Sequence, residues 1–141
     1  MKRRITETTE ETMKLGERYS QNLKGGESLC LYGELGSGKT IFTKGIARGL
    51  GVKQRLLSPT FIIVRQYDVI KKPFQKLYHL DLYRIKSPKE AVELGLRDFL
   101  NKKENIVVIE WPEKLGEFLP KNRIDIHFKD LGDNKREINY E

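Results

Sequence analysis

A glycine-rich segment that runs into a lysine and a threonine carries the clearest chemistry in this sequence. The phosphate-binding loop pattern, two glycines five residues apart followed by Lys and a hydroxyl residue, is matched in full by Gly33, Glu34, Leu35, Gly36, Ser37, Gly38, Lys39 and Thr40. Glycines allow the tight curvature that turns successive backbone N–H groups toward phosphate oxygens. Lysine at this place puts a positive charge beside the β- and γ-phosphates, and the threonine hydroxyl is an oxygen ligand of the kind that Mg²⁺ prefers. We therefore expect residues 33–40 to bind a nucleotide, with Lys39 at its phosphates and Thr40 on the metal ion.

Two acidic residues in apolar segments are candidates for the carboxylate that such a site needs beside the loop. Glu110 follows the apolar run 106–109, which is typical of the middle of a parallel sheet. Asp81 stands in the segment 80–83, whose apolar character is weaker. Position therefore favours Glu110 as the metal ligand. For Asp81 two roles stay open, a catalytic one in hydrolysis or a structural hydrogen bond.

Thr60 is a further catalytic candidate. It lies in Ser58-Pro59-Thr60-Phe61, where a rigid turn and a hydroxyl group directly precede a predicted strand. Such a segment suits a switch that senses the γ-phosphate and Mg²⁺. The alternative is a simple loop cap.

Three other residues are expected to pack rather than react. His79 is flanked by strand residues and lacks a partner at metal-site spacing, so we expect a packed or surface histidine. Trp111 follows the apolar run 106–109 closely and is expected to be a core or sheet-end aromatic. Cys30 is the only cysteine and lies in an apolar segment, which indicates a buried packing role.

The prediction of ATP rather than GTP as the nucleotide rests on the absence of a matching guanine-binding motif. Guanine-specific P-loop proteins commonly carry Asn-Lys-x-Asp after a strand, and the nearest match here is Asn101-Lys102-Lys103-Glu104. Its last residue is Glu, and it precedes a predicted strand where the guanine loop should follow one. ATP is therefore favoured over GTP by elimination.

The elements that must hold these residues follow from periodicity and capping signals. A capping-box spacing at 8–11 opens a helix that ends near 25–26, and another helix follows the loop. The expected strands are 28–32, 61–67, 76–83, 105–110, 123–128 and 136–140, and the expected helices are 8–23, 39–50 and 88–100. The 61–67 and 76–83 strands are placed to form a hairpin, and a turn at 132–134 joins the last two strands. The pattern predicts an α/β fold of the P-loop NTPase type, a mostly parallel central sheet covered by helices on both faces, plus antiparallel edge strands.

Length and composition limit the number of domains and the kinds of partner that this chain can have. The chain of 141 residues has room for one compact domain, which we place over 1–141. Its net charge of +7 is a weak indication of an anionic partner. No apolar run approaches the roughly 20 residues of a membrane-spanning helix, and no apolar stretch follows the basic start, so we expect a cytoplasmic protein without a membrane partner.

Taken together, these blocks resemble the TsaE (YjeE) family of bacterial P-loop ATPases. The likeness rests on the loop 33–40, on 58–61, on His79-Leu80-Asp81-Leu82-Tyr83-Arg84, on Glu93-Leu94-Gly95-Leu96 and on Ile109-Glu110-Trp111-Pro112-Glu113. The resemblance implies a Mg²⁺-dependent ATPase that works with the proteins TsaB and TsaD during threonylcarbamoylation of adenosine 37 in tRNA. It leaves open whether the chain itself touches tRNA or meets it only through these partners.

The resemblance also implies residue roles. Lys39 and Thr40 take the phosphate and Mg²⁺ roles, Glu110 a Mg²⁺ role, and Asp81 and Thr60 roles in hydrolysis or switching. Thr12, in the first-helix segment, is expected to border the nucleotide. No arginine is clearly placed as an arginine finger, although Arg65 and Arg84 lie near candidate site segments. Slow turnover by the chain alone is therefore expected.

Two other functions remain as alternatives. A small-molecule or nucleotide kinase uses the same loop but needs an acceptor pocket and usually an arginine-bearing lid, and no helical insertion of suitable length is present. A basic RNA- or protein-binding module in which nucleotide only stabilises the fold is the alternative of another class.

Overall fold

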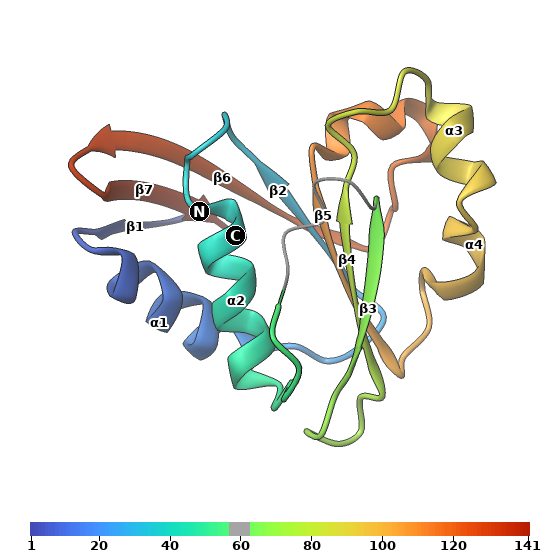
Figure 1. Cartoon of the computed structure of the whole chain (residues 1–141), viewed down its shortest axis with the longest axis horizontal. Helices are drawn as coiled ribbons and strands as arrows, with labels where there is room; N and C mark the ends of the chain where they lie inside the picture. Colours follow the sequence, from blue (N-terminus) through green and yellow to red (C-terminus); the bar gives the residue numbers. More distant parts are fainter. Residues whose placement is uncertain (57–62) are drawn as a thin grey trace.

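One sheet of seven strands runs through the part of the chain that the computed structural model describes, residues 1–56 and 63–141 (Figure 1). The strands are β1 (Lys2–Thr6), β2 (Ser28–Tyr32), β3 (Val64–Asp68), β4 (Lys76–Asp81), β5 (Asn105–Glu110), β6 (Arg123–Gly132) and β7 (Lys135–Tyr140). Their order is β1-β7-β6-β2-β5-β4-β3. Neighbours among β6, β2, β5 and β4 are parallel, and the β1-β7, β7-β6 and β4-β3 pairs are antiparallel. The expected α/β fold, with a mostly parallel centre and antiparallel edges, is confirmed.

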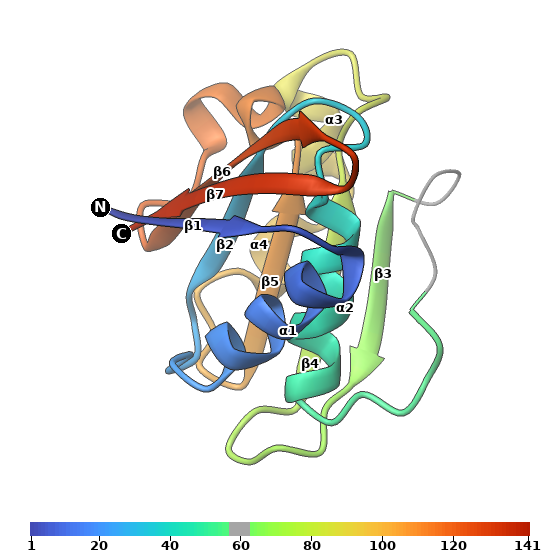
Figure 2. The same cartoon turned by 90° about the vertical axis from the view of Figure 1, so that its left-hand side faces the viewer.

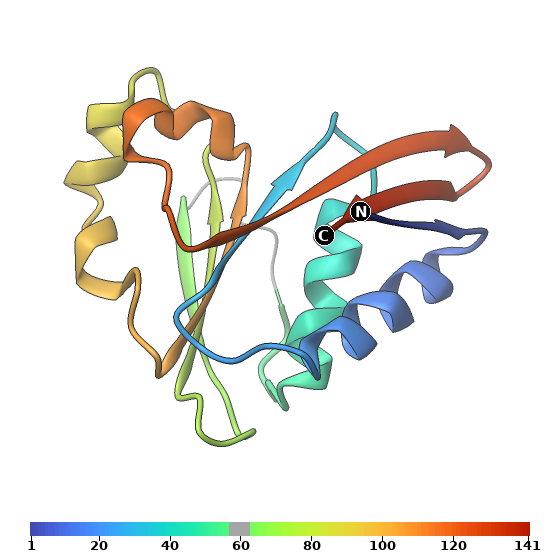
Figure 3. The same cartoon turned by 180° about the vertical axis from the view of Figure 1, so that it is seen from behind.

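Helices cover the sheet on both faces, as Figures 1 and 3 show from opposite sides. One face carries α1 (Thr9–Ser20) and α2 (Lys39–Gly49), and the other carries α3 (Pro88–Glu93), α4 (Leu96–Phe99) and the 3₁₀ helix η1 (Pro112–Phe118). Because side chains alternate along a strand, each central strand supplies both cores. The core under α1 and α2 takes Leu29, Leu31, Ile106 and Val108, and the core under α3 and α4 takes Cys30, Val107 and Ile109.

The predicted packing role of Cys30 is confirmed. Its side chain is fully buried, and burial raises the pKa of the thiol to about 12. A thiol in this environment stays protonated and unreactive near neutral pH.

Glycines let α1 and α2 approach closely. A Cβ atom on Gly45 would lie 2.0 Å from the carbonyl oxygen of Met13, and one on Gly16 would lie 2.3 Å from that of Phe42. The N-terminus of α1 is capped as predicted, because the Thr8 side chain accepts a hydrogen bond from the N–H of Glu11 at 3.1 Å. This close packing fixes the direction of α2 and therefore of the loop that precedes it.

Three elements differ from the sequence prediction, the first being the 3₁₀ helix η1 (Pro112–Phe118), which was not predicted. A single helix over 88–100 is wrong: the chain turns at Gly95, which has φ +85°, and two short helices flank it. Residues 2–6 form an edge strand that the sequence did not indicate, because its one aliphatic side chain, Ile5, is exposed and backbone pairing with β7 holds it. Figure 2 shows the two chain termini side by side as a result of this pairing.

The two predicted hairpins are present. β3 pairs with β4 from Val64 opposite Leu80 to Asp68 opposite Lys76, while positions 61–62 of the predicted strand lie outside the described residues. The β6–β7 turn places Asp133 and Asn134 at positive φ, as a tight hairpin turn requires. Along the described part of the chain, no helix combines the length and apolar character needed to cross a membrane.

Candidate nucleotide-binding site

The loop between β2 and α2 has the backbone geometry of a phosphate cradle. It leaves the buried strand β2 at Tyr32 and enters α2 at Gly38, which has φ +102°. The first hydrogen bond of α2 is donated by the N–H of Phe42 to the carbonyl oxygen of Gly38 at 2.9 Å. The N–H groups of the first helical turn before Phe42 therefore remain available for an anion, and the helix dipole favours negative charge there.

Lys39 is held inside this loop. Its side chain is buried, its Nζ donates a hydrogen bond to the carbonyl oxygen of Gly33, and its Nζ lies 4.0 Å from the ring centroid of Trp111. Burial lowers the pKa of the ammonium group, and the carboxylates of Glu110, Asp81 and Glu113 partly oppose that shift. The nearby carboxylates thus help to keep the desolvated ammonium group of Lys39 charged, as binding of a phosphate at this loop requires.

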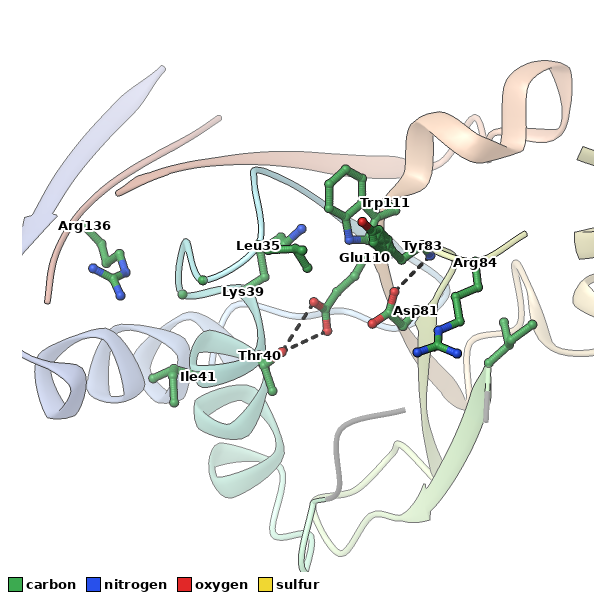
Figure 4. Close-up of a pocket in the computed structure, with 13 residues that line it drawn as sticks. Leu35, Lys39, Thr40, Ile41, Asp81, Tyr83, Arg84, Glu110, Trp111 and Arg136 are labelled. Carbon is green, nitrogen blue, oxygen red and sulfur yellow. Dashed lines mark hydrogen bonds between the residues drawn. The ribbon is translucent and has the colours of Figure 1, made fainter. Parts of the chain in front are cut away.

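Thr40 and Glu110 meet because β2 and β5 are parallel neighbours. Parallel register places Leu31 opposite Glu110, so the end of β5 lies beside the start of the loop. The Thr40 Oγ1 lies 3.4 Å from both carboxylate oxygens of Glu110 (Figure 4). Glu110 itself is buried. The structure thus brings together the two residues that the sequence predicts as metal ligands.

This pair fits Mg²⁺. Adjacent ligands of an octahedral Mg²⁺ ion with bonds of about 2.1 Å lie about 3.0 Å apart, close to the separation of the Thr40 and Glu110 oxygens. Among the described residues no group of three or more His, Cys, Asp or Glu side chains could hold a metal ion. A site built on one hydroxyl and one carboxylate would leave places in the Mg²⁺ shell for phosphate and water, as is usual for this ion.

His79, on the neighbouring strand β4, contacts the carboxylate of Glu110. The imidazole is fully buried on β4, and its Nε2 lies 2.6 Å from Glu110 Oε2. An ionised carboxylate can only accept, so in the tautomer that carries a proton on Nε2 this nitrogen donates to Glu110. The other ring nitrogen, Nδ1, is buried and has no hydrogen-bond partner among the residues that the structure describes. The prediction of a packed histidine is confirmed, but sequence spacing missed its partner.

Asp81 completes the acidic side of the site. It lies directly opposite Glu110 in the parallel β4–β5 register, and its Oδ1 accepts a hydrogen bond from the N–H of Tyr83 at 3.0 Å. Burial raises the pKa of the Asp81 carboxyl group, and the charge of Glu110 adds to the shift, while the bond from Tyr83 opposes it. Two carboxylates with different surroundings therefore stand side by side at the carboxyl edge of the sheet.

These residues surround one pocket of about 570 Å³ (Figure 4). Its lining is formed by Leu35, Gly36, Gly38, Lys39, Thr40, Ile41, Ile63, Asp81, Tyr83, Arg84, Glu110, Trp111 and Arg136. Loop, helix, sheet edge and hairpin thus each contribute a wall.

Some predicted site residues lie elsewhere. Thr12 lies on α1 and is buried against β1, with its hydroxyl 2.6 Å from that of Thr6, and it is not among the residues that line this pocket. Thr60 falls outside the described residues. The segment 101–104, which does not match the guanine motif and is not predicted as part of the site, precedes β5 at the opposite end of that strand from Glu110.

Trp111, Tyr83 and Arg136 were not predicted as parts of the site. Trp111 follows β5 directly, as expected of a sheet-end aromatic, but its ring covers Lys39 and stacks on Tyr83 with centroids 5.0 Å apart. Arg136 comes from β7, far along the sequence. The signal that could have found Arg136 is its parity with the apolar residues Ile138 and Tyr140, which face α1 and α2.

The comparisons with known proteins agree on one family. A family model described as "Threonylcarbamoyl adenosine biosynthesis protein TsaE" matches residues 6–138. The TsaE protein of Bacillus subtilis (strain 168) is 38% identical over 135 residues, which cover 96% of this chain and 82% of that protein. The TsaE protein of Aquifex aeolicus (strain VF5) is 40% identical over 116 residues, 81% of this chain and 79% of that protein. The crystal structure of YdiB from Bacillus subtilis superimposes with a TM-score of 0.79 and 32% identity, covering 99% of this chain and 83% of that one.

Proposed function

The chain belongs to the TsaE family of threonylcarbamoyl adenosine biosynthesis proteins, and from this premise we propose that it is a Mg²⁺-dependent ATPase supporting that modification of tRNA. The family membership supports the role in threonylcarbamoyladenosine biosynthesis. The ATPase reaction is supported by one observation above all, the meeting of Lys39, Thr40 and Glu110 at the ends of two parallel strands.

Each residue has a part in the proposed reaction. Lys39 places its charge at the β- and γ-phosphates, while the N–H groups of the first turn of α2 bind phosphate oxygens. Thr40 and Glu110 would hold Mg²⁺, which neutralises charge on the terminal phosphates when bound. The chain's side chains thus bind and orient the triphosphate in an electrostatically prepared pocket.

Asp81 is the residue that we propose to orient the attacking water. Its Oδ1 accepts a hydrogen bond from the N–H of Tyr83, and Oδ2 is the oxygen that we propose accepts a hydrogen bond from the water. A carboxyl group whose pKa is raised by burial is a better proton acceptor than an exposed one. For Thr60 we keep the predicted switch role as part of this proposal.

The proposed partners are TsaB and TsaD. Arg84 lines the pocket near Asp81, and the wall also includes apolar side chains such as Leu35, whose side chain is 68% exposed. The resemblance to the TsaE family is what supports these partners, and a partner protein would cover the exposed Leu35 and Tyr83 beside the pocket. We therefore propose slow hydrolysis by the chain alone and faster hydrolysis when partners supply a charge or order a loop.

The test is steady-state phosphate release. Release from Mg-ATP is measured for the chain alone, then with TsaB, TsaD and tRNA, and Lys39→Ala serves as the matched blank. We expect a partner-dependent rise that disappears in the variant and on chelation of Mg²⁺. Equal use of GTP and no response to partners would contradict the proposal. Transfer of phosphate to a small acceptor without release to water would favour a kinase instead.

A further inference from the structure

Arg136 reaches the pocket from a part of the fold that carries no other pocket-lining residue. It is the second residue of β7 and pairs across the hairpin with Asp130 on β6. Strand alternation puts its side chain on the face shared with Ile138, above the start of α2. Its stem lies directly on the loop, because a Cβ atom on Gly38 would be 3.3 Å from Arg136 Cδ and Nε.

The guanidinium group is held in place by its neighbours. Arg136 Nη1 donates to Asp130 Oδ1 at 2.9 Å and to the carbonyl oxygen of Lys135 at 3.0 Å. The Arg136 side chain is 15% exposed, while that of Asp130 is 49% exposed. The group is thus oriented and partly neutralised before any ligand binds.

The pocket has two chemically different ends. Figure 4 shows Arg136 on one side of the loop and Glu110 and Asp81 on the other, with Lys39 and Thr40 between them. Thr40 and Glu110 would hold Mg²⁺, which would neutralise charge on the terminal phosphates, so in the proposed site the terminal phosphates belong at the Glu110 side. The nucleoside must then extend in the opposite direction, toward Arg136.

The geometry points to Arg136 as the platform for the base: we infer that its guanidinium plane packs on the purine ring of the bound nucleotide. This inference rests on the proposed function, since it assumes a nucleotide in this pocket. Two observations favour the base over a phosphate. Asp130 already balances the charge of Arg136, and backbone N–H groups of the first turn of α2 remain available for the phosphates. A guanidinium plane stacks well on aromatic rings, which a lysine side chain does not reproduce.

The test compares two ligands that differ in the base. Dissociation constants of Mg-ADP and of magnesium pyrophosphate are measured by calorimetry for the wild-type chain, Arg136→Ala and Arg136→Lys. Lys129→Ala is the matched control, because it removes one positive charge from the same hairpin at an exposed position outside the pocket lining. Pyrophosphate binding also reports whether each variant has a folded loop.

Base stacking of this kind is worth roughly a 5- to 150-fold change in affinity. We expect both Arg136 variants to bind ADP more weakly by this factor, with pyrophosphate affinity unchanged within about twofold and Lys129→Ala like wild type. Equal weakening toward both ligands would overturn the inference in favour of a phosphate contact, and unchanged ADP binding would overturn it outright. A wild-type chain that bound neither ligand would overturn the proposed function itself.

Discussion

The two faces of strand β5 have different roles, although both are formed by alternate side chains of the same six residues. Toward α1 and α2, Ile106 and Val108 pack in one core and Glu110 ends the row at the pocket. Toward α3 and α4, Val107 and Ile109 are packed among apolar side chains throughout. His79 and Asp81 on β4 belong to the first face as well.

This difference shows how a parallel sheet separates chemistry from support. Side chains alternate between the two faces of a strand. A polar residue on the first face can therefore be substituted without leaving a cavity in the core on the second face. Substitutions of the polar residues on the first face, Glu110, His79 and Asp81, should therefore alter turnover more than stability, and substitutions of the apolar residues on the second face the reverse. The following variants test that separation, from the largest expected effect to the smallest.

Glu110→Gln should have the largest effect on turnover. The amide keeps the size of the side chain and can still accept from His79 but lacks the charge that favours Mg²⁺. We expect phosphate release to fall on the order of 100- to 1000-fold, as for loss of a principal electrostatic group. Mn²⁺ binding followed by electron paramagnetic resonance should weaken in parallel, while the urea midpoint changes little. Full activity in this variant would mean that Glu110 is not a metal ligand in this site.

Ile109→Ala, one residue earlier, should do the opposite. Its side chain is fully buried in the core under α3 and α4, so truncation leaves a cavity and costs about 2–5 kcal/mol of unfolding free energy. Urea denaturation measures this loss, with Ile109→Val as the milder control. Turnover per folded molecule should stay near wild type. A variant of normal stability and poor turnover would break the comparison between the faces.

His79→Gln tests whether a buried neighbour on the first face positions Glu110. Its hydrogen bond fixes Oε2 of Glu110, and loss of such a supporting partner typically costs about 10- to 100-fold in metal affinity or activity. The measurement is the Mn²⁺ dissociation constant beside kcat and KM for ATP, with His79→Ala for comparison. Because the Gln amide can donate one hydrogen bond, it should retain more Mn²⁺ affinity than Ala. If both variants lost stability alone, His79 would be only a packing residue.

Sequence reasoning found most of the first face because its signals are local. The loop 33–40 is contiguous, and Glu110 is marked by the apolar run before it, so both could be predicted together with the strands that bear them. Parity along β7 places Arg136 on the face of Ile138, but the groups that His79 and Arg136 meet depend on strand order and register between segments far apart in sequence. The break at Gly95 was missed because the apolar spacing continues across it and only the positive φ ends the helix.

Asp81→Asn should change the free energy of unfolding only slightly. We expect the variant to be more stable but less active, so the two effects have opposite signs. Burial raises the pKa of this carboxyl group above its unfolded value, so the native state holds the charged form at a disadvantage. The wild-type penalty is absent at low pH, where both states are protonated, and grows as the pH rises through the native pKa. Asn keeps an oxygen for the N–H of Tyr83 and has no charge, so we expect the variant to be more stable at neutral pH by less than about 1 kcal/mol, a figure limited by solvent screening of the half-buried group. Urea unfolding at several pH values should show this gain shrinking toward acid, while phosphate release at neutral pH falls. A gain independent of pH would mean that packing, not the charge of Asp81, sets the difference.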